Sequence, residues 1–272
     1  MFALLGTTTI GDCDATVLFT TVKFAICALP DVTSVARSCA GCVVEFGSAW
    51  TAICATPALS VVMVTVCACG CAGLPVTNGT PCADDSLCTA DACQAGACVG
   101  TPAPAGVCRT PIQPFKSQLL LKDRTSDRSD QVVWKWSRGA DTTLGDLGDP
   151  STNDAYELCV YGPGPALVFS SRIPAGGTCA GSSCWKVIPG KGFSYKDKDR
   201  TPDGLEKLSL KAGVGGVAKI SLKGKGERLD LPALGSIALP IEVQLRRTGQ
   251  CWGASFSSAI QSTSEQLKAK SD

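Results

Sequence analysis

Three aspartates followed by a glycine are the most obvious candidates for metal chemistry in this sequence. Asp197, Asp199 and Asp203 precede Gly204 within the segment DKDRTPDG. Closely spaced carboxylates in a loop are the ligands that a hard cation such as Ca²⁺ prefers. Two extra residues separate the last aspartate from the position that an EF-hand spacing requires, and a tight turn between two strands explains the same residues. We therefore expect a turn, with a calcium site as the alternative and no other cofactor.

Tryptophans suggest a second kind of chemistry, because an exposed indole ring can stack on a sugar ring. Trp134 and Trp136 share one face of an expected strand, and Trp252 stands beside Cys251. If these rings are buried, they are large core residues that pack over disulfides. We expect burial, and the alternative is a carbohydrate-binding module that uses Trp134, Trp136 or Trp252.

Lysines recur in two expected strands of the C-terminal half. Lys207, Lys211, Lys219 and Lys223 fall mostly on the solvent-facing sides of these strands. They could line a groove for an acidic partner, but solvated lysines that protect sheet edges are commoner. We expect the second arrangement.

The sequence contains no histidine, which excludes every histidine-based acid or base and every mixed Cys/His zinc site. Gly213–Gly216 lies between two expected strands and is a hairpin turn, because a phosphate-binding loop needs a helix after it. A secreted glycosidase-type hydrolase is a third option, since two carboxyl groups could meet in the fold. We expect no catalytic residues, and a non-catalytic extracellular or cell-surface structural or interaction module.

Cysteine usage indicates an oxidising compartment, because 17 thiols in one chain are typical of disulfide-stabilised exported proteins. Residues 77–108, which we call the central segment, contain few large apolar side chains, so disulfide cross-links must replace a hydrophobic core there. Four cysteines of this segment are expected to form a disulfide knot with three open connectivities: Cys82, Cys88, Cys93 and Cys98. Cys108 is left to pair upstream or across the linker that follows.

A second even set of cysteines lies in the C-terminal half. Cys179 and Cys184 close a short loop, whereas Cys159 and Cys251 both lie on expected strands. We expect one Cys179–Cys184 disulfide and one Cys159–Cys251 disulfide.

Short runs with period-two alternation, separated by Gly, Pro, Asp and Ser, dominate the chain from residue 117 onward. No long helical stripe occurs, so we expect a mainly β protein with an antiparallel β-sandwich over residues 117–262 and a polar tail at 263–272. Nine strands are expected: Gln118–Lys122, Gln131–Ser137, Tyr156–Tyr161, Ala166–Arg172, Trp185–Ile188, Leu205–Lys211, Val217–Lys223, Pro240–Arg246 and Cys251–Ser257.

Charge is distributed unevenly along the chain. Residues 1–114 carry 7 acidic and 3 basic residues, whereas the remainder carries 17 and 22. We expect a disulfide-knot module at 77–108 and a Pro-rich linker at 109–116. The total of 25 Lys+Arg against 24 Asp+Glu provides no molecule-wide field that would attract nucleic acid.

Residues 1–76 are a low-charge, cysteine-containing segment without the basic start of a signal peptide, and Ala58–Val66 is too short to span a bilayer. The segment is either disordered or the product of a frame error or misplaced start, because Gly-Asp codons read one base out of frame yield the sequence of Val62–Val66. Cys69 follows a segment that loosely resembles the lipobox of bacterial lipoproteins, so membrane attachment would depend on an N-terminal anchor.

The segment CTADACQAGAC, which begins at Cys88, is similar to Cys/Asp/Gly-rich repeats of large secreted proteins from myxobacteria and other environmental bacteria. Such repeats often precede a β domain like the one marked here by ELCVYG, GGTCAGSSCWK, YKDKDRTPDG and QCWGASFS. The resemblance covers about residues 77–272 and implies a secreted or cell-surface location more than an activity. A surface protein or a glycan is the expected partner, nucleic acid is not, and the oligomeric state stays open.

Overall fold

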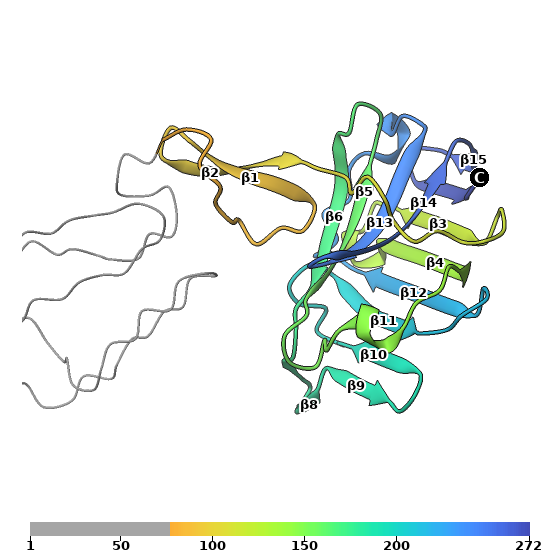
Figure 1. Ribbon diagram of the computed structural model, residues 1–272. Coiled ribbons are helices and arrows are strands. Elements are labelled where there is room, and N and C mark those ends of the chain that lie inside the picture. Colours follow the sequence, from red (N-terminus) through yellow and green to blue (C-terminus); the bar gives the residue numbers. More distant parts are fainter. Residues whose placement is uncertain (1–76) are drawn as a thin grey trace, which may run out of the picture. The chain divides into compact units, whose positions relative to one another are not determined.

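The computed structural model describes residues 77–272, which form two units (Figure 1). The expectations for residues 1–76 lie outside the described residues. Residues 77–84 and 91–99 belong to the smaller unit, and residues 85–90 and 100–272 form the larger one. This division differs from the expected boundary at residue 108, because part of the central segment belongs to the β domain.

A hairpin forms most of the central segment. Its strands β1 (Thr89–Gln94) and β2 (Ala97–Pro102) are joined through Ala95 and Gly96, which both have positive φ angles, of 50° and 83°. Two consecutive left-handed residues suit the right-handed twist of a hairpin. In the smaller unit a disulfide joins Cys82 to Cys98.

An eight-stranded antiparallel sheet is the larger layer of the β domain. Its strand order is β15-β16-β3-β4-β12-β11-β10-β9. The strands are β3 (Ser117–Lys122), β4 (Gln131–Gly139), β9 (Trp185–Ile188), β10 (Gly192–Lys196), β11 (Leu205–Lys211), β12 (Ala218–Lys225), β15 (Ala259–Ser262) and β16 (Gln266–Lys270).

A four-stranded antiparallel sheet with the order β14-β13-β5-β6 is the second layer. It consists of β5 (Tyr156–Tyr161), β6 (Leu167–Ile173), β13 (Ile241–Arg247) and β14 (Gln250–Phe256). Short elements connect the strands: β7 (Thr178–Cys179), β8 (Ser182–Ser183), one-turn helix α1 (Leu144–Leu147), and the 3-10 turns Asp127–Ser129 and Leu234–Ser236.

The core lies between the two sheets and is built from the alternate residues that the period-two pattern predicts. In β12, for example, Ala218, Ile220 and Leu222 are buried, whereas Lys219 and Ser221 are exposed. The indole N–H of Trp136 in β4 donates to the carbonyl of Gly253 in β14 at 3.1 Å, which links the two layers. The mainly β, antiparallel fold expected from the sequence is confirmed.

All nine expected strands are present, with ends that shift by at most two residues. The polar tail predicted at 263–272 is wrong, because Gln266–Lys270 is strand β16 and lies between β15 and β3 in the large sheet. Leu267 and Ala269 point into the core from this strand. Two apolar residues among polar neighbours were too weak a signal to identify it.

Candidate functional site

The outer face of the small sheet is covered by chain that precedes the sandwich. We call residues 85–88 and 103–109 the strap. All six residues of β5 are buried, because Leu158 and Val160 enter the core while Glu157, Cys159 and Tyr161 lie under the strap. A sheet face that would otherwise be solvated is therefore closed.

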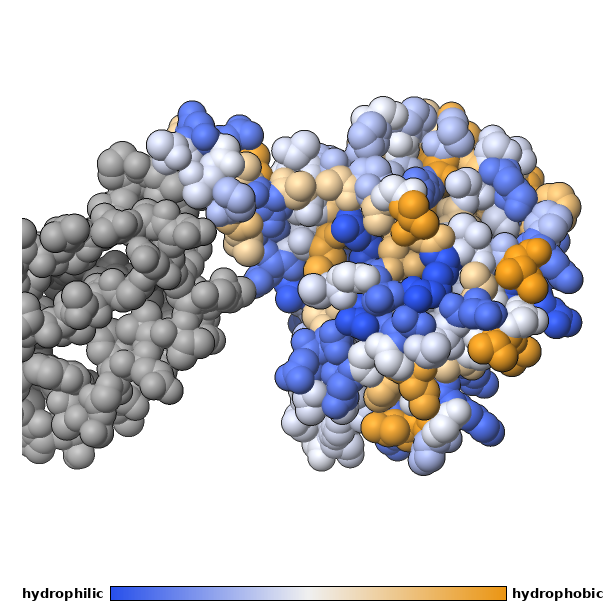
Figure 2. Space-filling view, viewed as in Figure 1, coloured by the Kyte–Doolittle hydropathy of each residue, from blue (hydrophilic) through white to orange (hydrophobic). Residues whose placement is uncertain are grey.

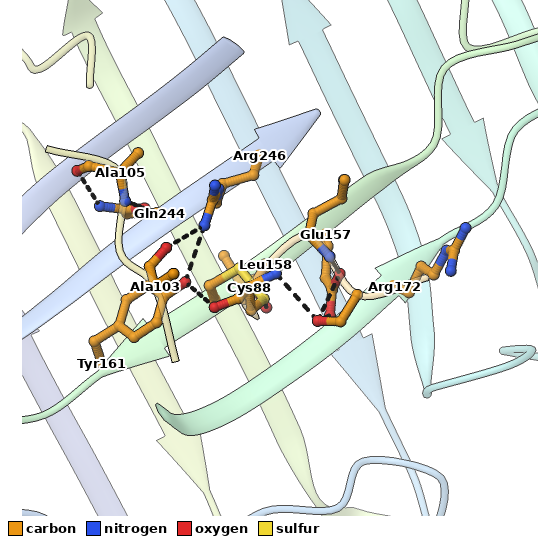
Figure 3. Close-up of a disulfide and its surroundings, with 12 residues drawn as sticks. Cys88, Ala103, Ala105, Glu157, Leu158, Tyr161, Arg172, Gln244 and Arg246 are labelled. Atoms are coloured by element: carbon orange, nitrogen blue, oxygen red, sulfur yellow. Dashed lines mark hydrogen bonds between the residues drawn. A yellow bond between two sulfur atoms is a disulfide. The ribbon is translucent and has the colours of Figure 1, made fainter. Parts of the chain in front are cut away.

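Cys88 is the central attachment of the strap (Figure 3). It forms a disulfide with Cys159, and its carbonyl accepts hydrogen bonds from the Tyr161 hydroxyl at 2.8 Å and from the Ala103 N–H at 3.0 Å. The N–H of Leu87 donates to the carboxylate of Glu157 at 2.5 Å. The disulfide and the Tyr161 hydrogen bond therefore both hold Cys88, and a further hydrogen bond holds the adjacent Leu87.

The second part of the strap lies along β13 and β14. The side-chain amide of Gln244 accepts from the N–H of Ala105 and donates to its carbonyl, both at 3.0 Å, and Arg246 donates to the carbonyl of Ala103 at 2.6 Å (Figure 3). A second disulfide joins Cys108 to Cys251. Two disulfides therefore fix the strap to the small sheet.

These bonds correct the expected cysteine pairing. The Cys159–Cys251 prediction is wrong, because β13 separates β5 from β14. Neighbouring strands are about 4.8 Å apart, so two strands of separation exceed the Cα distance that a disulfide tolerates. Cys159 pairs with Cys88 and Cys251 with Cys108, whereas the expected Cys179–Cys184 disulfide is confirmed.

The knot and linker are corrected as well. The expected four-cysteine knot is wrong, because Cys88 pairs with Cys159 in the β domain. Cys82 and Cys98 pair with each other, and Cys93 is disulfide-bonded, but to neither of them. Cys108 pairs with Cys251, so of the two expected alternatives the pairing across the linker is confirmed. Residues 109–116 are hydrogen-bonded to the domain, since Arg109 exchanges backbone bonds with Cys251 and Gly253.

The aspartates of the expected calcium loop are turn residues. The buried carboxylate of Asp197 accepts hydrogen bonds from the N–H groups of Asp199 and Thr201, both at 2.8 Å, and Asp203 accepts from the N–H of Arg172. Burial alone would raise the pKa of Asp197, but the hydrogen bonds from Thr201 and Asp199 hold it below its usual range. In residues 77–272 no three acidic or cysteine side chains converge to hold a metal ion. The turn expected between two strands is confirmed, with Asp197 and Asp203 as acceptors of backbone hydrogen bonds, and calcium binding by Asp197, Asp199 and Asp203 stays an untested alternative.

The tryptophans of the expected sugar platform are core residues. Trp134, Trp136 and Trp252 are each 0% exposed. Trp252 also donates its indole N–H to the hydroxyl of Thr142 at 3.1 Å. The carbohydrate-binding interpretation of these three residues is therefore wrong, and their burial is confirmed.

Carboxyl groups with a raised pKa would be the signal of an acid catalyst. Burial raises the pKa of Glu157, which is covered by Ser86 and Leu87 of the strap. Burial also raises the pKa of Asp130, whose carboxylate accepts the N–H of Arg124 at 2.7 Å. Both carboxyl groups accept a hydrogen bond from a backbone N–H, that of Leu87 for Glu157 and that of Arg124 for Asp130.

Lysines gather on the outer face of the large sheet, along β4 and β9 to β12. Two open depressions of about 420 and 400 Å³ lie there and share Ser194 and Lys196. We call the following lining residues the lysine face: Lys135, Lys186, Lys196, Lys198, Lys207 and Lys223, with Ser194, Ser209 and Ser221. Five of the six lysines are exposed, and Lys223 is half-buried.

The strand register places like charges side by side on this face. Lys196 lies opposite Lys207, and Lys207 lies opposite Lys223. Such pairs are each destabilising, by roughly 0.2–1 kcal/mol. Glu206 compensates in part, with its carboxylate 3.5 Å from the ammonium of Lys207 and 3.9 Å from that of Lys223.

The other lysines of the face are not neutralised. Within the part of the chain that the structure describes, Lys135, Lys186, Lys196 and Lys198 form no ion pair. The face can therefore hold anions by charge, and its serines can add hydrogen bonds. The solvent exposure expected for Lys207, Lys211 and Lys219 is confirmed, whereas Lys223 is half-buried. Their expected role in protecting a sheet edge is wrong, because β11 and β12 are interior strands, and the sequence pattern did not indicate that Lys207 adjoins lysines of neighbouring strands.

Exposed apolar residues offer no comparable site. The large ones on the described surface are Val99, Val107, Ile112, Phe115, Leu144, Val187, Val214, Val217 and Ile260. On the side that Figure 2 shows, hydrophobic residues form separate spots among hydrophilic ones.

No protein-family model matches this chain, and no curated protein or solved structure is detectably similar to it. In residues 77–272 no helix is long and apolar enough to cross a bilayer.

Proposed function

We propose that this chain is a non-catalytic interaction module of an extracellular or cell-surface protein, and that it holds an acidic partner on the lysine face. The observation that carries the proposal is the row of Lys196, Lys207 and Lys223 on three adjacent strands. Folding alone favours alternating charges at such positions. The sheet retains like charges that lower its stability, and residues that lower stability in this way are typical of functional sites.

Disulfide bonding supports the proposed location. All nine cysteines of the described chain form disulfides. Thiols of cytosolic proteins stay reduced, so complete pairing favours an oxidising compartment. Alkylation without prior reduction, followed by mass spectrometry of the protein from culture medium or cell surface, should label none of these nine residues.

Binding of an acidic polymer tests the interaction directly. Fluorescence anisotropy of labelled polyglutamate should show binding at ~0.01 M ionic strength that weakens at ~0.15 M, because salt screens exposed charges. A Lys207→Gln/Lys223→Gln variant should lose roughly twenty-five-fold in affinity, at about five-fold per lysine.

A matched control separates the lysine face from net charge. Lys116→Gln/Arg128→Gln removes two exposed cations outside the face and should leave affinity unchanged. Equal losses in both variants would show that net charge alone attracts the polymer. Shortening of the bound polymer during the measurement would contradict the non-catalytic part of the proposal.

A further inference from the structure

We infer that the occupant of the lysine face is a linear acidic polysaccharide, with carboxylates on the lysines and sugar hydroxyls on the serines. This inference rests on the proposed function, because it names the partner of the same face. It does not involve the buried tryptophans, and its sugar contacts are polar.

Two parallel rows of polar side chains cross the sheet. Lys196, Lys207 and Lys223 form the first row, one residue on each of β10, β11 and β12. Neighbouring strands are about 4.8 Å apart, so the lysines of the row are attached to the sheet at that interval. One pyranose ring advances a linear glycan by a comparable distance, so carboxylates of one polymer can reach more than one lysine of the row.

The second row consists of hydroxyl groups. Ser194 lies opposite Ser209, and Ser209 lies opposite Ser221, two residues along the same three strands from the lysines. Two residues of a strand correspond to roughly 7 Å, which is within the width of a sugar ring with its substituents. Within the described chain these three hydroxyls form no hydrogen bond to the protein, so they are available to a ligand.

The composition of the face argues against nucleic acid. The residues that line its two depressions include no arginine, and their one aromatic residue, Tyr195, is buried. Single strands bind by stacking bases on aromatic side chains. A ladder of lysines and serines supplies no such stacking contact.

The same composition argues against a protein partner. Stable protein interfaces have an apolar centre surrounded by polar residues. The side chains that project from the lysine face are mainly lysines and serines, and the half-buried Val133 is the apolar exception on β4. A flat repeat of charges fits a repeating polymer better than a protein surface.

Three anionic probes distinguish the possible occupants. The oxidised full chain would be titrated with polygalacturonate, with polyglutamate of equal carboxylate number and with duplex DNA, at the same ionic strength. Polygalacturonate should bind five- to ten-fold more tightly than polyglutamate, because two hydrogen bonds to sugar hydroxyls add to the same charge attraction.

A serine variant tests the hydroxyl row itself. Ser209→Ala/Ser221→Ala, which leaves only Ser194 of the row, should bring polygalacturonate affinity most of the way down to that of polyglutamate and leave polyglutamate binding unchanged. The control Ser262→Ala/Ser264→Ala changes two exposed serines elsewhere and should alter neither affinity. Circular dichroism would show that both variants keep the β fold.

The outcomes separate this inference from the proposed function. Tightest binding to duplex DNA, or equal weakening of all probes by the serine variant, would overturn the polysaccharide and retain an acidic partner. Absence of binding to all three probes would overturn both.

Discussion

The side chain of Gln244 forms a pair of hydrogen bonds with the backbone of Ala105, accepting its N–H and donating to its carbonyl at 3.0 Å each. In this way a side chain of β13 provides the contacts that a neighbouring strand would make. The backbone N–H and carbonyl of Ala105 thus both have a hydrogen-bond partner in a place where water has little access, since Gln244 is buried.

Replacement of Gln244 by alanine should loosen the strap around Ala105. Both backbone groups lose their partner, which is expected to lower the free energy of unfolding by about 1–3 kcal/mol. Urea denaturation would measure the loss, and limited proteolysis would locate it within residues 103–109. Gln118→Ala, which changes an exposed glutamine of β3, should leave both measurements unchanged.

Removal of the Cys88–Cys159 disulfide should destabilise the domain more than removal of Cys179–Cys184. The first bond closes a separation of 71 residues and the second one of 5. A longer loop gains more freedom in the unfolded chain, so the paired serine variant at 88 and 159 should lose about 2–5 kcal/mol. Guanidinium denaturation of the two double variants would compare them, and a larger loss for the 179 and 184 pair would contradict this ranking.

Glu157 should make stability depend on pH in an identifiable direction. Burial raises its pKa, so the folded state binds the proton more readily than the unfolded state. The contribution of this group to stability should therefore be complete below its ordinary value of 4.5 and be lost as pH rises through the higher folded value.

Glu157→Gln removes that contribution, and the difference in unfolding free energy between the two proteins isolates it. Asp197, whose pKa is lowered, acts in the opposite direction but equally in both proteins. The wild type should lose stability relative to the variant as pH rises to neutral. A difference that does not change with pH would show that Glu157 titrates alike in the folded and unfolded chains.

Gly139 should not tolerate a side chain. A Cβ atom there would lie 1.8 Å from the ring of Trp136, which is buried. Gly139→Ala must displace that ring, and overpacking of this kind costs roughly 1–3 kcal/mol. Thermal unfolding and near-ultraviolet circular dichroism would detect the change, whereas Gly106→Ala, with no atom within 4 Å, is the control.

Local pattern was sufficient to predict much of the β domain. Alternation of polar and apolar residues identified Tyr156–Tyr161 and Leu205–Lys211 to the residue. The same alternation predicted that Trp134 and Trp136 face one side, and the structure shows that this side is the core. Period-two patterning is a property of consecutive residues, so it can be recognised without knowing their neighbours in space.

Disulfide pairing and the lysine face required the tertiary structure. Whether Cys159 can reach Cys251 depends on β13 lying between their strands, and sheet order is not encoded in either strand alone. The lysine face likewise draws Lys135 and Lys196 from strands far apart in sequence, and the sheet brings them onto one surface. The sequence by itself therefore determined the nine strongly patterned strands and the dry side of most of them, whereas the weakly patterned β16 and the covering of both faces of β5 depended on the tertiary structure. Strand order and register, set by the packing of the two sheets, decided which cysteines bond and which charges meet.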